Sequence, residues 1–261
     1  MATKFLTLVL VWIMALAMPT SAQIIVAAAA DLNAALTEIA ANYEKAGGSQ
    51  VRLSFGSSGN LFNQIQNGAP FDIFFSADVD YPKKLIEAGL AEKSSLYPYA
   101  VGQLVLWVPA SSSLDVEHRG MSILLDPSVK KISLANPEHA PYGRAAVAAL
   151  RHFRLYEKVS DRFVFGENVS QAAQFVESGN AQAGFVALSH AMAPGIREKG
   201  RYWIIPSDAY PALQQAVVIL SHSSKKAEAA AFLQYLKKPE ATAVLRHYGF
   251  SVPKEAQEAK H

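Results

Sequence analysis

The chain has 261 residues, of which 51% are hydrophobic, and it carries 24 basic against 22 acidic side chains. A formal net charge of +2 gives no sign of the basic surface that nucleic acids or anionic membranes require. The chain contains no cysteine, which excludes disulfides and a lipid-anchored lipoprotein.

The first 22 residues have the pattern of a cleaved secretory signal peptide. Lys4 gives the segment a positive start, residues 6–18 form an unbroken apolar run, and Thr20-Ser21-Ala22 supplies the small residues of a cleavage site. The alternative is an N-terminal membrane anchor, but the run is shorter than the ~20 residues that a spanning helix needs. We therefore expect a mature chain that starts near Gln23 and lies outside the cytoplasm.

Short β-rich runs alternate with helix-period segments along the mature chain. The pattern predicts strands over residues 24–28, 51–54, 72–76, 101–108, 131–135, 162–165, 184–187 and 216–220. It predicts helices over residues 32–43, 61–67, 81–88, 144–153, 170–178, 226–236 and 239–248. This alternation indicates an α/β fold with mostly parallel sheets flanked by helices.

Open α/β sheets bind ligands at the carboxyl ends of their strands, so the residues that follow each strand are candidate site residues. Four strand-to-helix junctions stand out, at residues 27–31, 56–60, 136–143 and 166–169. At residues 56–60, Gly-Ser-Ser-Gly-Asn directs backbone N–H groups, a serine hydroxyl and a helix dipole at one point, as anion sites do. Each junction alone is typical of ordinary helix capping. Together they favour one oxyanion site made of neutral donors.

The same segments carry a resemblance to a known family. They are Ala-Ala-Ala-Asp-Leu at 28–32, Phe-Gly-Ser-Ser-Gly-Asn at 55–60, Gly-Ala-Pro-Phe-Asp-Ile-Phe-Phe-Ser-Ala-Asp at 68–78, Asn-Pro-Glu-His-Ala-Pro-Tyr-Gly at 136–143, Glu-Asn-Val at 167–169 and Arg-His-Tyr-Gly-Phe at 246–250. In this content and order, the chain resembles the periplasmic molybdate-binding (ModA) family, the soluble receptors of molybdate ABC importers.

The resemblance implies a two-lobed type II periplasmic binding protein whose lobes are joined by two crossing strands, near residues 100–102 and 211–214. Lobe I would comprise residues 23–101 and 211–261, and lobe II residues 102–210. The implied ligand is molybdate, and the same site would also take tungstate. The implied partner is an ABC permease with its cytoplasmic ATPase. The resemblance implies no cofactor, no enzymatic activity, no nucleic acid and no membrane-embedded segment, and it implies a monomer.

The ligand-binding residues implied by the resemblance are Ala30, Asp31, Ser58, Tyr142 and Val169. Ser58 would donate both its hydroxyl and its N–H, while Asp31 and Val169 would donate their N–H groups. Molybdenum would be bound as its oxyanion, and no site for a free metal cation is expected.

This chain departs from the family pattern at two positions. Ala187 stands where the family commonly has a tyrosine, and we expect the Tyr142 hydroxyl to replace that missing donor from the opposite side of the cleft. Asp31 stands where the family commonly has a hydroxyl donor, and its carboxylate at ~4 Å would repel a dianion by roughly 1 to 4 kcal/mol. Either the side chain turns back to cap its own helix, which we favour, or it accepts a hydrogen bond from a protonated oxyanion.

Other functions remain as alternatives. A receptor for another oxyanion such as phosphate would share the fold and differ only in the cleft. Gly56-Ser57-Ser58-Gly59 resembles a hydrolase nucleophile elbow, but Asn60 occupies the last glycine position and no catalytic partner can be assigned. The seven histidines show no metal-ligand spacing, and the sequon Asn168-Val169-Ser170 has no role in a binding protein.

Overall fold

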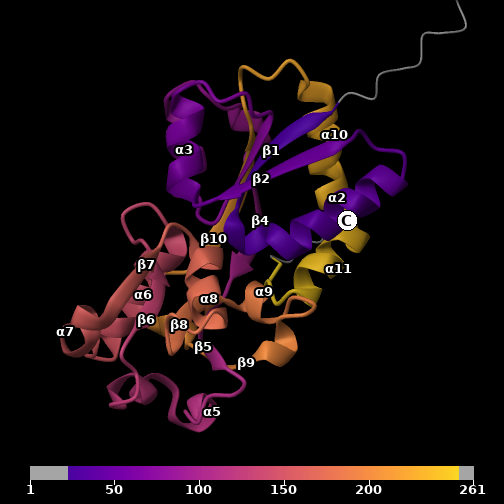
Figure 1. The fold of residues 1–261 in the computed structure, drawn as a ribbon. Helices are drawn as coiled ribbons and strands as arrows, with labels where there is room; N and C mark the ends of the chain where they lie inside the picture. Colours follow the sequence, from indigo (N-terminus) through magenta and orange to yellow (C-terminus); the bar gives the residue numbers. More distant parts are fainter. Residues whose placement is uncertain (1–22, 253–261) are drawn as a thin grey trace, which may run out of the picture.

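The computed structural model describes residues 23–252, which form two lobes, each built on a five-stranded sheet (Figure 1). The predicted signal peptide, residues 1–22, lies outside the described residues, as do residues 253–261. In order of pairing, the sheet of the first lobe contains β2 (Val51–Gly56), β1 (Ile24–Ala29), β3 (Ile73–Ser76), β10 (Leu213–Ile219) and β4 (Tyr97–Gly102). The sheet of the second lobe contains β7 (Phe163–Gly166), β6 (Ile132–Ala135), β8 (Ala183–Ala187), β5 (Leu104–Pro109) and β9 (Gly200–Ile204).

The two sheets share one topology, and each is mostly parallel. β1 runs parallel to β2 and β3, and only β10 runs against its neighbours, antiparallel to both β3 and β4. In the second lobe β6 runs parallel to β7 and β8, while β5 is antiparallel to β8 and β9. The α/β fold class predicted from the alternating pattern is therefore confirmed.

Helices cover both faces of each sheet because successive strand residues point to opposite sides. In β1, Val26 and Ala28 pack in a cluster with α2 (Asn33–Lys45), α10 (Lys226–Leu236) and α11 (Pro239–His247). Ala27 between them packs against α3 (Ser58–Gln66) and α4 (Asp80–Glu87) on the other face. Such two-sided burial explains why β1 reads as a continuous apolar run.

The second lobe is layered in the same way. One face of its sheet packs with α5 (Val116–Arg119), α6 (Pro141–His152), α7 (Tyr156–Val159) and the 3₁₀ turn η4 (Gly120–Leu125). The other face packs with α8 (Val169–Glu177) and α9 (Leu188–Ala191). The remaining 3₁₀ turns are η2 (Ala30–Leu32), η3 (Lys93–Ser95), η5 (Ser160–Arg162), η6 (Arg197–Lys199) and η7 (Ser207–Ala209).

The chain passes between the lobes twice. Gln103 is the single residue between β4 in the first sheet and β5 in the second. The prediction of one strand over residues 101–108 is therefore wrong, because a continuous extended run carries no mark of where it changes sheets. The chain returns between the end of β9 and the start of β10, and β9 itself was not predicted. The exact lobe boundaries remain a prediction.

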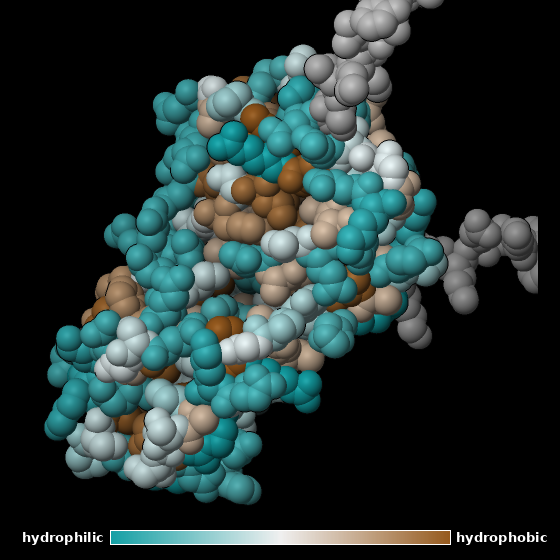
Figure 2. Space-filling model, turned by 45° about the vertical axis from the view of Figure 1, so that its right-hand side comes forward, coloured by the Kyte–Doolittle hydropathy of each residue, from teal (hydrophilic) through white to brown (hydrophobic). Residues whose placement is uncertain are grey.

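Polar residues dominate the face of the molecule seen in Figure 2, where an apolar patch is visible on the upper lobe. None of the described helices is long and apolar enough to cross a membrane.

Candidate functional site

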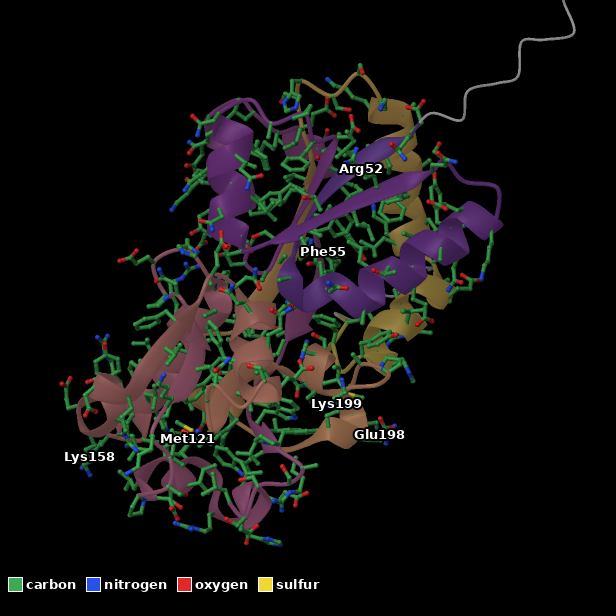
Figure 3. The ribbon with its side chains drawn as sticks, in the orientation of Figure 1. Arg52, Phe55, Met121, Lys158, Glu198 and Lys199 are labelled. Atoms are coloured by element: carbon green, nitrogen blue, oxygen red, sulfur yellow. The ribbon has the colours of Figure 1, made fainter. Side chains whose placement is uncertain are left out.

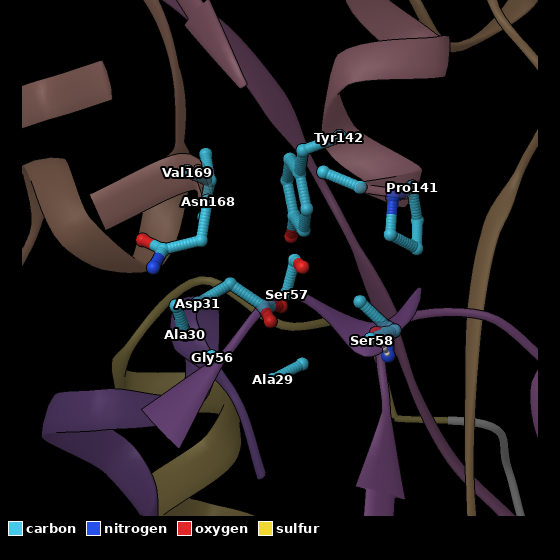
Figure 4. A pocket seen from close by; sticks show the side chains of 12 residues that line it. Ala29, Ala30, Asp31, Gly56, Ser57, Ser58, Pro141, Tyr142, Asn168 and Val169 are labelled. Atoms are coloured by element: carbon cyan, nitrogen blue, oxygen red, sulfur yellow. Dashed lines mark hydrogen bonds between the residues drawn. The ribbon is translucent and has the colours of Figure 1, made fainter. Parts of the chain in front are cut away.

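A cavity lies between the lobes, where strand ends of both sheets meet (Figure 4). Its empty space is about 200 Å³, counting the open space at its mouth. In the first lobe, β2 carries Arg52 and Phe55 (Figure 3) and ends at Gly56, where the loop that borders the cavity begins. The residues that line the cavity come from all four predicted junctions and from the end of β3: Ala29, Ala30, Asp31, Gly56, Ser57, Ser58, Ala77, Ala140, Pro141, Tyr142, Asn168 and Val169. The five predicted site residues thus share one cavity.

The N-terminus of α3 leaves one backbone donor for the cavity. The first turn of a helix has N–H groups without intrahelical partners. The Asn60 N–H donates to the hydroxyl of the N-cap Ser57 at 3.3 Å, and the Gly59 N–H donates to the carbonyl of His139 at 2.9 Å. The Ser58 N–H is the donor of this turn that remains for a ligand.

The N-terminus of α8 leaves its first donor in the same way. The side chain of the N-cap Asn168 accepts hydrogen bonds from the N–H groups of Ser170 and Gln171, both at 3.0 Å. The N–H of Val169, the first residue of the helix, remains for the cavity. Asn168 therefore caps the helix, and the sequon to which it belongs is part of the cavity wall.

The Ser58 hydroxyl is oriented by the end of β3. Ser58 is buried, and its Oγ accepts a hydrogen bond from the Ala77 N–H at 2.9 Å. Because that bond uses an oxygen lone pair, the hydroxyl proton is available to donate to a ligand. The structure thus gives Ser58 two donors, its N–H and its O–H.

Tyr142 brings a second hydroxyl to the cavity from the opposite lobe. α6 begins at Pro141, so Tyr142 lies in its first turn, and its ring points toward the loops of the first lobe (Figure 4). The hydroxyl is buried and has no hydrogen-bond partner among the described residues. Burial, followed by the nearby Asp31 carboxylate, raises its pKa well above the ordinary value of 10.0, so it stays a neutral donor.

Asp31 does not cap a helix, so the orientation that we favoured from the sequence is wrong. The residue lies inside η2, and α2 begins two residues later without a side-chain cap. Instead, Asp31 Oδ2 accepts a hydrogen bond from Gln215 Nε2 at 2.5 Å, and Oδ1 has no hydrogen-bond partner among the described residues. The Tyr142 hydroxyl is near enough to lower the pKa of the carboxyl, although no hydrogen bond of ordinary geometry joins the two groups.

Burial raises the pKa of Asp31 from 3.8 to about 6, because a charged carboxylate is poorly solvated there. The hydrogen bond from Gln215, the nearby Tyr142 hydroxyl and the backbone N–H of Asp31 act in the opposite direction, but burial outweighs them. Asp31 therefore titrates nearer to neutral pH than an exposed aspartate does.

Gln215 and Tyr99 belong to the site but were not predicted. Gln215 is fully buried on β10, and its Oε1 accepts a hydrogen bond from the Tyr99 hydroxyl on β4 at 2.7 Å. A glutamine inside the apolar run of a strand was the only signal in the sequence, and it did not reveal its partners. Ala187, by contrast, ends β8 and does not line the cavity.

Hydroxyls of the second lobe contact the carbonyls of η2 beside the cavity. Ser170 Oγ donates to the Ala30 carbonyl at 3.1 Å, and Ser189 Oγ donates to the Asp31 carbonyl at 2.7 Å. These bonds fix the backbone of Ala30 and Asp31 against α8 and α9.

Side chains outside the cavity lining also join the lobes. Arg144 Nη2 pairs with Asp78 Oδ2 at 2.6 Å, and Asn60 Nδ2 donates to Glu167 Oε1 at 2.8 Å. Burial raises the pKa of Asp78, although Arg144 opposes that shift. The lobes thus contact each other on several sides of the cavity.

His139 lies beside the loop at the start of α3, and its Nδ1 lies 2.9 Å from Ser57 Oγ. Ser57, not Ser58, is therefore the serine with a histidine neighbour, and it is also occupied as the N-cap of α3. Among the described residues, no group of three or more His, Cys, Asp or Glu is placed to hold a metal ion. The polar lining suits an anion, since it consists mainly of N–H and O–H donors.

Comparisons with known proteins show the family of the chain. The family model described as "Bacterial extracellular solute-binding protein" matches residues 24–251. The "Molybdate-binding protein ModA" of Azotobacter vinelandii is 40% identical over 232 residues, which cover 89% of this chain and 91% of that protein. The protein of the same name from Rhodobacter capsulatus is 38% identical over 239 residues, covering 91% and 92%.

Among solved structures, the periplasmic molybdate-binding protein of Azotobacter vinelandii is similar, with a TM-score of 0.83 and 35% identity. The match covers 88% of this chain and all of that chain. By both sequence and fold, the chain belongs to the bacterial extracellular solute-binding proteins and, within them, to the periplasmic molybdate-binding protein family.

Proposed function

We propose that the protein captures molybdate in the cavity between its lobes and delivers it to the permease of an ABC importer. One observation carries the proposal. The N-termini of α3, α6 and α8 and the hydroxyls of Ser58 and Tyr142 meet in one cavity, and the described lining residues include no lysine, arginine or histidine. Neutral donors and helix dipoles can hold an oxyanion without a cation.

Each proposed ligand residue has a distinct role. Ser58 donates its hydroxyl and its N–H, and Val169 donates its N–H. Ala30 and Asp31 line the cavity with the backbone of η2. Their carbonyls already accept hydrogen bonds from Ser170 and Ser189 of the second lobe. Tyr142 donates its hydroxyl from α6. It takes the role of the tyrosine that the family commonly has at the position of Ala187.

The number of donors is sufficient for tight binding. A hydrogen bond to a charged group contributes roughly 1.5 to 3 kcal/mol, so four or five of them contribute roughly 6 to 15 kcal/mol before costs. After the costs of association and of lobe movement, micromolar to nanomolar affinity follows. Selectivity would rest on cavity size, because molybdate and tungstate are larger than sulfate and phosphate.

The transport cycle follows from the two passages between the lobes. A hinge at Gln103 and in the segment between β9 and β10 would let the lobes separate to admit the anion and close on it. The closed form would be recognised by the permease, which acts with a cytoplasmic ATPase. We infer a periplasmic monomer that has no catalytic role.

Thermal-shift titration of residues 23–261 with molybdate, tungstate, sulfate, phosphate and chromate tests the proposal. We expect large upward shifts in Tm with molybdate and tungstate and smaller or no shifts with the others, since a ligand that binds only the folded state stabilises it. Ser58→Ala should reduce the molybdate shift. No shift with molybdate or tungstate would overturn the assignment.

A receptor for phosphate is the second candidate, and the Asp31 carboxylate is the observation that favours it. An ionised carboxylate can accept a hydrogen bond from the proton of hydrogen phosphate. Molybdate carries no proton near neutral pH and cannot donate such a bond. A phosphate shift larger than the molybdate shift in the same titration would favour this candidate.

A further inference from the structure

The Asp31 carboxyl presents a single free oxygen to the cavity. Asp31 is 4% exposed, and its Oδ2 is occupied by the Gln215 amide, whereas its Oδ1 has no hydrogen-bond partner among the described residues. Asp31 is also one of the residues that line the cavity. A buried polar atom without a partner is uncommon in folded proteins and calls for an explanation.

The Gln215 amide lies between Tyr99 and Asp31. Its Oε1 accepts a hydrogen bond from the Tyr99 hydroxyl at 2.7 Å, and the Ser76 carbonyl lies 3.2 Å from the same hydroxyl. Its Nε2 donates to Asp31 Oδ2 at 2.5 Å. With Oδ2 occupied in this way, Oδ1 is the oxygen left for a ligand.

Within residues 23–252, no cationic side chain is paired with Asp31. Among the described residues, no lysine, arginine or histidine nitrogen lies within 4.0 Å of its carboxyl oxygens, and every ion pair of the described chain involves another acidic residue. Its neighbours Gln215, Tyr99 and Tyr142 are neutral, and the pKa values of both tyrosines are raised well above 10.0, chiefly by burial.

The titratable groups on the elements packed around η2 are engaged elsewhere or distant. Those with partners are Glu38 of α2 with Tyr248, Glu44 with the Val51 N–H, Arg144 of α6 with Asp78, Glu177 of α8 with His190 of α9, and His139 with Ser57. Tyr43 of α2 packs against Phe232 and Tyr235. Lys45 of α2 and Arg151 and His152 of α6 lie in the last turns of their helices, away from the cavity. Burial without compensation is why the pKa of Asp31 is raised to about 6.

A dianion in the cavity would meet this uncompensated carboxylate directly. Repulsion between two negative groups in contact favours protonation of one of them. A carboxylic acid held neutral by an apolar environment is a good hydrogen-bond donor, as known protein sites show. The free Oδ1 is the atom that can carry that proton.

We propose that Asp31 binds the oxyanion as a neutral carboxylic acid, with Oδ1 donating the hydrogen bond, so that capture of a dianionic tetrahedral oxyanion takes up one proton from solvent. The proton moves from solvent to Asp31 Oδ1, and no other covalent bond forms or breaks. Oδ2 keeps the hydrogen bond from Gln215, and Oδ1–H points at an oxygen of the ligand. The inference deepens the proposed function and rests on it.

This arrangement favours oxyanions that carry no proton of their own, because Oδ1–H needs an acceptor. When the pH is above the pKa of Asp31 in the ligand-free protein, each complex holds one more proton than its separate components. The affinity should therefore fall by up to about tenfold for each unit of rising pH, until the pH reaches the pKa of Asp31 in the ligand-bound protein. Below pH 6 Asp31 is already protonated, and the dependence on this group disappears.

Isothermal titration calorimetry with sodium molybdate tests the inference on residues 23–261. At pH 7.5, titrations in buffers of different ionisation enthalpy should give an uptake of about one proton for each molybdate bound. Between pH 6 and 8.5 the Kd should rise by up to about tenfold for each unit. Asp31→Asn, which keeps an N–H donor at this position, should bind molybdate with no proton uptake and with a Kd that does not change over this range.

Asp126→Asn is the matched control, because Asp126 is an aspartate of the second lobe outside the cavity lining. It should retain both the proton uptake and the pH dependence. Molybdate binding by the unaltered protein without proton uptake would overturn the inference and leave the proposed function intact. Absence of any molybdate binding would overturn both. The uptake measurement on the unaltered protein decides the matter even if Asp31→Asn fails to fold.

Discussion

Gly102 at the end of β4 faces the Tyr142 hydroxyl so closely that a Cβ atom at this position would lie 2.2 Å from the hydroxyl oxygen. The same Cβ would lie 2.7 Å from Gln215 Nε2. Both distances are far below van der Waals contact, so only glycine leaves room for these two polar groups to stand side by side. The crossing strand thus shapes the wall of the cavity through a missing side chain.

Gly102→Ala should weaken molybdate binding, because the added methyl group must displace the Tyr142 hydroxyl or the Gln215 amide. We expect a loss of at least tenfold in affinity, measured by calorimetry, with a folded protein by circular dichroism. If the methyl acts through Tyr142, its effect and that of Tyr142→Phe should not add in the double variant. Unchanged affinity in Gly102→Ala would contradict the proposed placement of this hydroxyl.

Tyr142→Phe should reduce molybdate affinity by about ten- to a hundredfold. The change removes one hydroxyl donor, and a hydrogen bond to a charged group is worth about 1.5 to 3 kcal/mol. Tyr156→Phe is the control, since that ring packs against Phe163 on the second lobe, outside the cavity lining. Equal affinities for the two variants would mean that Tyr142 only covers the cavity.

The position of the site was predictable because its signals are local. Ser57 and Asn168 cap helices that follow strands, and such junctions carry small and polar residues whatever the rest of the chain does. Parallel strands bring their carboxyl ends to one edge, so residues far apart in sequence meet there. Whether Ala30, Asp31, Ser58, Tyr142 and Val169 bind the ligand remains a prediction.

The direction of individual side chains was not predictable in the same way. Asp31 has the residue type and position of an N-cap, yet its carboxyl bonds to Gln215, which is 184 residues away in sequence. The apolar pattern over residues 101–108 did not show the change of sheet at Gln103, although the family resemblance implied a crossing near residues 100–102. The edge strand β9 was missed, since it does not change the local pattern of apolar residues. Contacts of this kind depend on the completed fold.

Asp31→Asn should stabilise the ligand-free protein at neutral pH. The folded-state pKa of Asp31 is raised from 3.8 to about 6, so folding is favoured by the protonated form. Its contribution is fully present below about pH 4 and is lost as the pH rises through 6, by about 3 kcal/mol in total. We expect the variant to be more stable at pH 8 by up to that amount, and equal at pH 4.

Urea denaturation at pH 4, 6 and 8 measures this difference. Asp126→Asn again serves as the control, because hydrogen bonds from Ser128 lower the pKa of this partly exposed carboxyl. Its substitution should not stabilise the protein at pH 8. A stability difference between Asp31→Asn and the unaltered protein that is independent of pH would contradict the raised pKa.

Gly59→Ala should weaken binding by keeping the lobes apart. A Cβ at Gly59 would lie 2.5 Å from the Tyr81 hydroxyl and 2.6 Å from the His139 carbonyl, which belongs to the second lobe. The loop around His139 would have to move, and the hydrogen bond from the Gly59 N–H would be lost. We expect at least a fivefold loss of molybdate affinity, whereas Gln64→Ala, at an exposed position of the same helix, should have no effect.

The ion pair between Arg144 and Asp78 should contribute to ligand affinity more than to fold stability, because it joins the two lobes. Arg144 Nη2 and Asp78 Oδ2 are 2.6 Å apart, and their side chains are 42% and 14% exposed. A partly exposed pair of this kind is worth about 0.5 to 1 kcal/mol. Arg144→Gln should therefore weaken molybdate binding by about two- to fivefold at low salt.

Salt and a matched pair distinguish this effect from a general loss of stability. Lys226 and Glu92 form a pair of similar length, 2.7 Å, but both residues belong to the first lobe. Lys226→Gln should leave the affinity unchanged at every salt concentration. The deficit of Arg144→Gln should shrink at about 1 M salt, where charges are screened over about 3 Å. An equal loss of affinity in both variants would show that the Arg144 pair does not act by holding the lobes together.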